Sequence, residues 1–375
     1  MHKCTKSGII MPDMPTQTQE HIKRIVDFEP WVGASSTELG YEGEHLHIER
    51  HRYTDPENQQ QFNITDIDAR PNGEGPTVIY LTSHNYRIDE LLERRMSIYA
   101  TQTKSRVIIC EMPGITMNRE NPNRTKGAFQ IPDQTSALLR GNWEPTSTAQ
   151  LKAIDAVIGL EDGQEIQLLG ESMSTHSVVG VLQSVAHGSF EKNLNFTKID
   201  LIEPINTSGK LSLGKIADLV SSLNTVEAFR KLIYLEENKR INHEVAPYEQ
   251  LHQKIVKRLN TRQLLATIAT GLGVRVGIDT GLLELMENSS STGLDLGSTR
   301  FTLITARESV VSSGKDARKL VQAINEKGGH AQHVMMKARK GDVTSEGQPT
   351  PIGHAFGTSL GRQASQALIA YELAA

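Results

Sequence analysis

Short apolar runs alternate with stretches of helical periodicity over most of the chain. Apolar runs rich in β-branched residues and bounded by turns predict buried strands, and the amphipathic stretches between them predict helices. The predicted strands are His45–Tyr53, Gln61–Arg70, Thr77–Leu81, Arg106–Cys110, Glu165–Leu169, Lys198–Ile202 and Phe301–Ile304. The predicted helices include Arg87–Thr101, Thr148–Ile158, Ser174–His187 and Gly314–Asn325. The alternation predicts an α/β fold, with a mostly parallel central sheet and helices on both faces.

The alternation of strands and helices is interrupted once. Between Asn206 and Leu296 the pattern is mostly helical, and no apolar run there is as clear a strand as its neighbours. Helices inserted late in a βα series are most simply a cap over the carboxyl ends of the strands, where α/β proteins bind ligands. We therefore expect an N-terminal extension (1–44), an α/β core (45–206 and 298–375) and a helical cap (207–297).

The clearest candidate for chemistry is the pentapeptide Gly170-Glu171-Ser172-Met173-Ser174, which lies between a predicted strand and a predicted helix. A serine on a strained strand-to-helix turn holds its hydroxyl above the edge of the sheet, so its flanking positions must be small. The backbone N–H of the next residue and the helix N-terminus then face a developing oxyanion. The pattern predicts a nucleophile elbow at Ser172.

With these residues the chain resembles the α/β-hydrolase superfamily, in its serine esterase, thioesterase and acyltransferase branches. The further segments that carry the resemblance are Val78–Asn85, Val107–Gly114, Leu303–Val311, the pair Gly353-His354 and the closing helix Gly361–Leu373. The resemblance extends over residues 45–205 and 298–375, and it implies the chain order serine, acid, histidine.

The resemblance implies a role for each candidate residue. Ser172 is expected as the nucleophile, His354 as the base and Glu308 as the acid, with Asp316 and Glu203 as alternative acids. Oxyanion donors are expected from the backbone N–H groups of Met173 and Asn85, with His84 as the alternative. The chain departs from the family pattern twice: Ser174 replaces the usual elbow glycine, and the loop at 82–85 lacks the usual His-Gly pair.

Other histidines fit structural roles better. His330 and His333 lie at the start of the predicted last strand, where a satisfied or half-exposed histidine is expected. His45, His47, Glu49 and His51 share one face of a strand, and such a group could bind zinc. Leu46 and Ile48 occupy the opposite face, so the same pattern fits a strand with one solvated face. We expect no metal and no cofactor.

The amino-acid composition argues against several classes of protein. The 375-residue chain has 40 basic and 44 acidic side chains and a formal net charge of −4, too balanced for a nucleic-acid footprint. Its two cysteines, Cys4 and Cys110, exclude a disulfide scaffold. No apolar stretch approaches the ~20 residues of a membrane span, and no signal peptide is recognisable. We expect a cytoplasmic protein, and the sequence leaves a homo-oligomer possible.

The expected function is that of a serine hydrolase that cleaves an ester or thioester bond through an acyl-enzyme. The Leu- and Ile-rich insertion suggests a small-molecule acyl substrate with an apolar part. Two alternatives remain. One is an acyltransferase or thioesterase that passes the acyl group to an acceptor other than water. The other is a non-catalytic binding protein that retains the fold.

Overall fold

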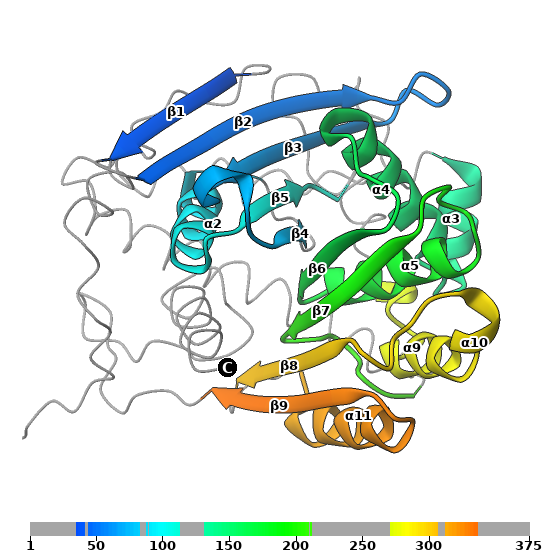
Figure 1. The fold of residues 1–375 in the computed structure, drawn as a ribbon. Coiled ribbons are helices and arrows are strands. Elements are labelled where there is room, and N and C mark those ends of the chain that lie inside the picture. The colour runs from blue at the N-terminus through cyan, green and yellow to red at the C-terminus, as the bar shows by residue number, and fades with distance from the viewer. Residues whose placement is uncertain are drawn as a thin grey trace, which may run out of the picture.

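A nine-stranded sheet forms the centre of the fold (Figure 1). The computed structural model describes residues 35–41, 44–82, 88, 90–112, 131–209, 211, 271–306 and 312–336. In chain order the strands are β1 (Ser35–Tyr41), β2 (Glu44–Thr54), β3 (Gln61–Asp68), β4 (Thr77–Leu81), β5 (Arg106–Cys110), β6 (Gln164–Glu171), β7 (Leu194–Ile202), β8 (Arg300–Ala306) and β9 (His330–Met336).

The order of the strands across the sheet is β1-β2-β3-β5-β4-β6-β7-β8-β9. The pairings β1–β2, β2–β3 and β3–β5 are antiparallel, and all later pairings are parallel. The carboxyl ends of β4 to β9 therefore lie along one edge of the sheet. This confirms the expected mostly parallel sheet.

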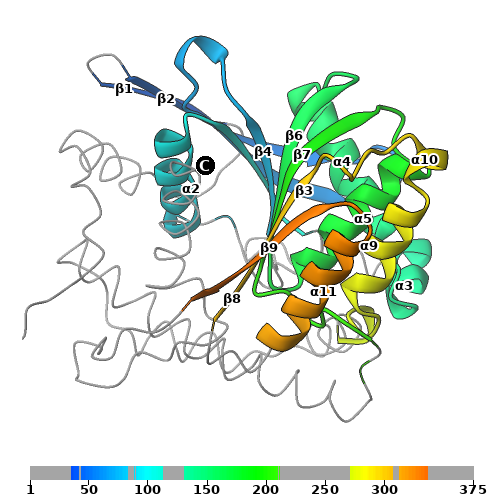
Figure 2. The same ribbon diagram turned by 60° about the horizontal axis from the view of Figure 1, so that its bottom comes forward.

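Helices cover both faces of the sheet. They are α2 (Glu90–Thr103), α3 (Pro132–Leu139), α4 (Glu144–Ile158), α5 (Ser174–Ala186), α9 (Ile278–Glu287), α10 (Ser289–Thr292) and α11 (Gly314–Glu326), with a short 3₁₀ turn, η1 (Pro71–Gly73). Figure 2 shows α2 on one side of the sheet and α4, α5, α9 and α11 on the other. Within the described part of the chain, no helix combines the length and the apolar character needed to cross a membrane.

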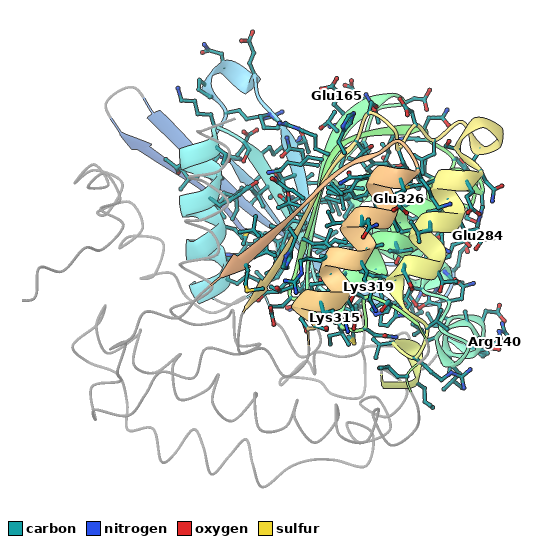
Figure 3. The ribbon with its side chains drawn as sticks, turned by 90° about the horizontal axis from the view of Figure 1, so that it is seen from below. Arg140, Glu165, Glu284, Lys315, Lys319 and Glu326 are labelled. Atoms are coloured by element: carbon teal, nitrogen blue, oxygen red, sulfur yellow. The ribbon has the colours of Figure 1, made fainter. Side chains whose placement is uncertain are left out.

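Local sequence patterns account for these elements. Every residue of β4 is buried, as expected for a strand covered on both faces. In α11 the buried residues Ala317, Leu320 and Ile324 follow the helical period. The charged side chains of Lys315 and Lys319 point away from the sheet (Figure 3).

One buried ion pair joins the antiparallel side of the sheet to α2. The Arg50 guanidinium of β2 donates two hydrogen bonds to the Glu93 carboxylate, at 2.7 Å from Nε to Oε1 and 2.6 Å from Nη2 to Oε2. The Thr65 hydroxyl of β3 also donates to Glu93 Oε1, at 3.1 Å. Because both charges are buried and paired in a bidentate geometry, they hold α2 against this face of the sheet.

The structure adds two elements to the expected organisation. Strand β1 pairs with β2 from within the segment 1–44, which the sequence pattern predicts as an extension. Helix α9 lies within the segment 207–297, expected as the cap, yet Ile278, Leu282 and Leu285 pack in the main core. Helix α9 contacts α5, so it belongs to the same helical layer on one face of the sheet. In the chain it lies in the connection from β7 to β8. Residues 212–270 of the expected cap lie outside the described residues.

Candidate functional site

Ser172 lies in the tight turn that joins β6 to α5. Its backbone φ is +59°, in the left-handed region that L-residues rarely adopt. Strand β6 ends at Glu171 and α5 begins at Ser174, so the strand–turn–helix context predicted for the nucleophile elbow is confirmed. Strained backbone of this kind persists only where its surroundings hold it, and it concentrates at functional sites.

Hydrogen bonds hold the strained turn from both sides. The Ser172 N–H donates to the Ile202 carbonyl at the end of β7, at 2.8 Å. The Thr175 hydroxyl donates to the Ser172 carbonyl at 2.6 Å. The His176 N–H donates to the Met173 carbonyl at 3.0 Å. The conformation of Ser172 is therefore fixed by the neighbouring strand and by the first turn of α5.

Ser174 is accommodated at the position where the family pattern has glycine. Its fully buried hydroxyl donates to the Glu171 carbonyl at 2.9 Å and accepts from the Glu171 N–H at 2.8 Å. The side chain thus closes the turn. By contrast, a Cβ at Gly170 would lie 2.7 Å from Val178 Cγ2 and 3.0 Å from the Ser174 carbonyl oxygen. Close packing of α5 on β6 therefore requires the first glycine of the motif.

Met173 directly follows the serine and is the N-cap residue of α5. Its side chain is buried in a small apolar cluster with Trp143 and Ile205. No described residue accepts a hydrogen bond from its N–H. An unpaired N–H at a helix N-terminus, next to the serine, is suited to receive an oxyanion.

Two of the candidate acids lie in the described part of the chain. Glu203 directly follows Ile202, is fully buried with a backbone φ of +48°, and donates its N–H to the Ile304 carbonyl at 2.7 Å. It therefore lies at the same edge of the sheet as Ser172. Asp316 lies in the first turn of α11, and its carboxylate is 3.4 Å from the Lys319 ammonium in a partly exposed pair.

The remaining predicted site residues, His84, Asn85, Glu308 and His354, lie outside the described residues and stay predictions. The strands that lead to three of them end beside the elbow. The register pairs Leu81 of β4 with Gly170, and Ile304 of β8 with Ile202. Segments that follow β4 and β8 therefore leave the sheet at the edge where Ser172 lies.

A buried hydrogen bond that sequence reasoning missed joins β4 to β6 at this edge. The Tyr80 hydroxyl donates to Glu171 Oε2 at 2.8 Å, and both side chains are almost fully buried. The sequence carried a signal at Tyr80, because it is a polar residue in the run Thr77–Leu81, which otherwise predicts a buried strand. A buried polar group needs a partner, but sequence spacing alone does not identify that partner.

His176 is a second functional candidate that sequence reasoning missed. Its Nε2–H donates to the Ile205 carbonyl at 2.9 Å, which ties the first turn of α5 to the segment after β7. The centre of its ring lies 5.7 Å from the centre of the Trp143 ring. Burial lowers the pKa of His176 to about 4, because the charged imidazolium is disfavoured away from water. The ring is therefore neutral near pH 7.

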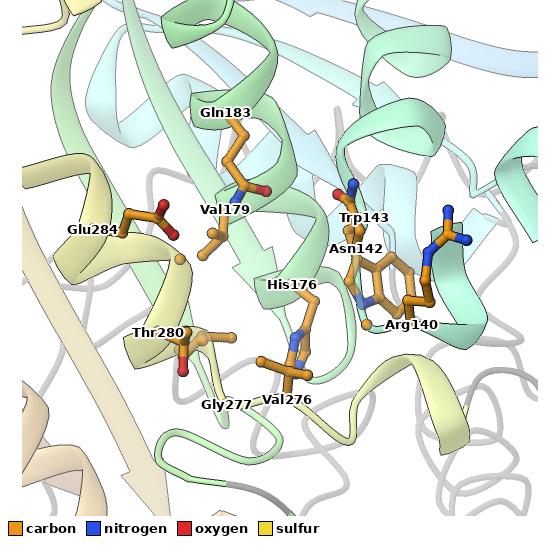
Figure 4. A pocket seen from close by; sticks show the side chains of 13 residues that line it. Arg140, Asn142, Trp143, His176, Val179, Gln183, Val276, Gly277, Thr280 and Glu284 are labelled. Atoms are coloured by element: carbon orange, nitrogen blue, oxygen red, sulfur yellow. The ribbon is translucent and has the colours of Figure 1, made fainter. Parts of the chain in front are cut away.

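A cavity of about 150 Å³ lies between α5, α9 and the turn that joins α3 to α4 (Figure 4). Its lining residues are Arg140, Gly141, Asn142, Trp143, His176, Val179, Gln183, Val276, Gly277, Ile278, Thr280, Gly281 and Glu284. Ser172 is not among them, so this cavity is separate from the elbow.

The other histidine candidates make structural contacts. His47 Nε2 lies 2.7 Å from Glu49 Oε1, and His51 Nε2 lies 3.4 Å from Glu49 Oε2. The hydrogen bond with His47 is the main reason that the pKa of Glu49 is lowered. Among the described residues, no group of three or more His, Cys, Asp or Glu side chains is arranged to hold a metal ion. His333 Nε2 is hydrogen-bonded to Thr305 Oγ1 at 2.8 Å.

The mostly parallel sheet, the helices on both faces and the strained serine between β6 and α5 define an α/β-hydrolase fold. No model of a known protein family matches the sequence. A search of curated proteins also finds no match.

Solved structures that resemble the chain include three enzymes. Esterase B from Lactobacillus rhamnosis is 14% identical, with 96% of this chain and 92% of that one covered and a TM-score of 0.45. A carboxylesterase from Bacillus subtilis is 11% identical, with 94% and 95% covered and a TM-score of 0.43. A haloalkane dehalogenase from Bradyrhizobium elkani is 11% identical, with 91% and 99% covered and a TM-score of 0.44. Likeness at this level identifies neither a reaction nor a substrate.

The strain at Ser172 predicts that a glycine substitution there is more stable than an alanine substitution, the reverse of the order found inside a helix. Ser172→Gly removes the Cβ that makes a positive φ unfavourable, whereas Ser172→Ala keeps it. We expect the glycine variant to be more stable by about 1 kcal/mol in urea unfolding. At Ser177, inside α5, the same pair should show the ordinary order, with glycine about 1 kcal/mol less stable than alanine. A glycine variant less stable than alanine at both positions would show that Ser172 is unstrained.

The buried His176 predicts a stability that depends on pH. Its folded pKa, about 4, lies below the ordinary value of 6.5, so the unfolded chain binds an additional proton between these values. The neutral ring therefore contributes about 3 kcal/mol to the free energy of unfolding. This contribution is fully present above pH 6.5 and is lost as the pH falls toward 4. His176→Gln, which keeps a donor for Ile205, should remove this part of the pH dependence. Equal pH profiles for the two proteins would contradict the assignment.

Proposed function

We propose that the chain is a serine hydrolase that cleaves carboxylic ester or thioester bonds through an acyl-enzyme. The observation that carries the proposal is the backbone of Ser172, with a φ of +59° in a hydrogen-bonded turn between β6 and α5. A serine gains nothing for folding from this conformation, whereas a nucleophile gains a hydroxyl that is held above the edge of the sheet.

The proposed reaction has two halves. The Ser172 Oγ attacks the acyl carbonyl carbon, and its proton passes to the His354 imidazole. The tetrahedral intermediate then collapses, the bond to the alcohol or thiol breaks, and His354 returns the proton to that leaving group. Water then attacks the acyl-enzyme by the same route, with His354 as base, and releases the carboxylic acid and Ser172.

The negative charge of the intermediate needs donors that are in place beforehand. The N–H of Met173 has no acceptor among the described residues, which supports it as one donor. Asn85 is proposed as the second donor and His84 as the alternative. Each such donor is typically worth ~10²–10³ in turnover, because it acts on charge that develops only in the transition state.

The acid that orients His354 is proposed to be Glu308, two residues beyond the end of β8. Glu203 is the alternative, supported by its complete burial at the edge of the sheet that carries Ser172. The pairing of Asp316 with Lys319 weighs against Asp316, since its charge already has a partner at the surface.

The substrate is proposed to be a small molecule whose acyl group has an apolar part. The support is the Leu- and Ile-rich sequence of residues 212–270, the part of the expected cap that precedes α9, and its expected place over the carboxyl ends of the strands. Hydrolysis and transfer to another acceptor share the same first half, so the acceptor decides between them.

Hydrolysis of p-nitrophenyl esters and of acyl thioesters tests the role of Ser172. We expect kcat of Ser172→Ala to fall by at least ~10³-fold, because the nucleophile is lost. Ser177→Ala is the matched control and should retain activity. Ser177 lies in α5, the helix that follows Ser172, and its hydroxyl is buried without a partner among the described residues. Residual activity within tenfold of wild type in Ser172→Ala, or a folded wild type without turnover on either class, would refute the proposal.

Three isosteric substitutions test the choice of acid. Glu308→Gln should lower kcat by orders of magnitude, because the imidazole loses the carboxylate that orients it and stabilises its cation. Asp316→Asn should leave kcat within threefold of wild type. If Glu203→Gln causes the large loss and Glu308→Gln does not, Glu203 is the acid. A large loss in Asp316→Asn alone would overturn both assignments.

A further inference from the structure

The cavity between α5 and α9 is a feature that the proposed reaction does not use. Its volume is about 150 Å³, which is enough for a molecule with a single ring. Every residue that lines it belongs to the described part of the chain, and Ser172 is not among them. The buried side chains at its floor and the exposed ones at its mouth therefore indicate which molecules fit it.

His176 places a hydrogen-bond acceptor at the floor of the cavity. Its Nε2–H donates to the Ile205 carbonyl at 2.9 Å, so Nδ1 carries the lone pair in the neutral ring. No described residue donates a hydrogen bond to Nδ1. The residue is only 3% exposed, yet Nδ1 keeps some accessible surface, unlike sealed atoms such as Ser177 Oγ. Because the His176 ring lines the cavity, Nδ1 opens onto it.

Apolar side chains form the walls next to this acceptor. Val179 of α5 and Ile278 of α9 belong to the main core. The Trp143 ring lies on the other side, close to the His176 ring (Figure 4). An apolar body that packs between these side chains leaves water and gains contact with an aromatic ring.

The charged residues at the mouth favour a ligand without net charge. Arg140 and Glu284 are exposed, carry opposite charges and lie on opposite sides of the cavity (Figure 4). Exposed charges contribute little to binding, and their opposite signs give no preference for an anion or a cation. Burial of a charged group at the floor is costly, and an anion there would face the lone pair of His176 Nδ1.

Hydrogen bonds hold the cavity in shape without a ligand. The Trp143 indole N–H donates to the Gly273 carbonyl at 2.9 Å. The Asn206 side-chain amide donates to the Val274 carbonyl at 2.9 Å, and the Asn206 carbonyl accepts from the Ile278 N–H at 3.1 Å. The chain before α9 is thereby fixed to the segment after β7. A preformed cavity with apolar walls and few polar groups is typical of a small-molecule site.

We propose that this cavity is a binding site for a small neutral molecule that has an O–H or N–H group on an apolar body of about one ring. The O–H or N–H donates to His176 Nδ1, and the apolar body packs against Val179 and Trp143. A molecule without a donor would displace water from Nδ1 and leave a buried acceptor unpaired, so the hydrogen bond decides selectivity. The site does not depend on the proposed hydrolase activity, because binding requires no turnover.

Two probes of the same shape test the role of the acceptor. Para-fluorophenol has the donor, and para-fluorotoluene has a methyl group in its place. Titration of the full chain near pH 7, followed by fluorine NMR, gives a Kd for each probe. We expect para-fluorophenol to bind at least about 5-fold more tightly, because only it satisfies Nδ1. Tighter binding of para-fluorotoluene, the more hydrophobic probe, would overturn the proposal, as would the absence of binding by either probe.

A cavity-filling substitution tests the location of the site. Val276 is a half-buried lining residue, and Val276→Phe places a larger ring in the cavity. We expect its Kd for para-fluorophenol to rise at least about 10-fold. Val157→Phe is the matched control, because Val157 is a half-buried residue of α4 that does not line the cavity, and its Kd should stay within about twofold of wild type. An unchanged Kd in Val276→Phe would show that the probe binds elsewhere.

Two further variants test which atom is the acceptor. His176→Phe removes Nδ1 and keeps a ring beside Trp143, so the preference should reverse in favour of para-fluorotoluene. Gln183→Leu removes a neighbouring polar side chain of the lining and should keep the preference for para-fluorophenol. The opposite pattern would overturn the assignment to His176. If either variant does not unfold cooperatively, the two probes in wild type and in Val276→Phe still decide whether the site exists.

Discussion

The backbone of Ser172 is the constraint on which the rest of the site depends. A positive φ at a residue with a Cβ is unfavourable by about 1–2 kcal/mol, and the surroundings must offset this cost. The Ile202 carbonyl accepts the Ser172 N–H, and the Thr175 hydroxyl binds the Ser172 carbonyl. Gly170 lets α5 approach β6 closely enough for these bonds to form. The sheet and the helix therefore select this conformation together.

Several buried polar groups lie near the edge of the sheet that carries Ser172. Tyr80 and Glu171 join β4 to β6, and the Glu111 carboxylate, which follows β5, accepts a hydrogen bond from the Ile88 N–H. His176 ties the start of α5 to the chain after β7. Each of these groups is costly to bury without a partner, so each contact has only one satisfactory arrangement. Together they make the edge rigid.

The sequence predicted the strands, the main helices and the elbow, because these depend on local periodicity and on turn residues. It did not predict β1 as part of the sheet, because a polar edge strand lacks an apolar pattern. It also placed α9 in the cap, since a core helix and a cap helix have the same periodicity. The partners of Tyr80 and Glu111 could not be predicted, because they come from distant parts of the chain. The hydrogen bonds by which the Ser174 hydroxyl closes the turn could not be predicted from the sequence either.

The central claim is that the strained serine is the reactive one. The most direct measurement is covalent labelling of the folded wild-type chain with a fluorophosphonate, followed by intact mass determination and peptide mapping. We expect one adduct per chain, located on Ser172, with no labelling after the chain is unfolded in urea. An adduct on another residue, or a folded chain that remains unlabelled, would contradict it.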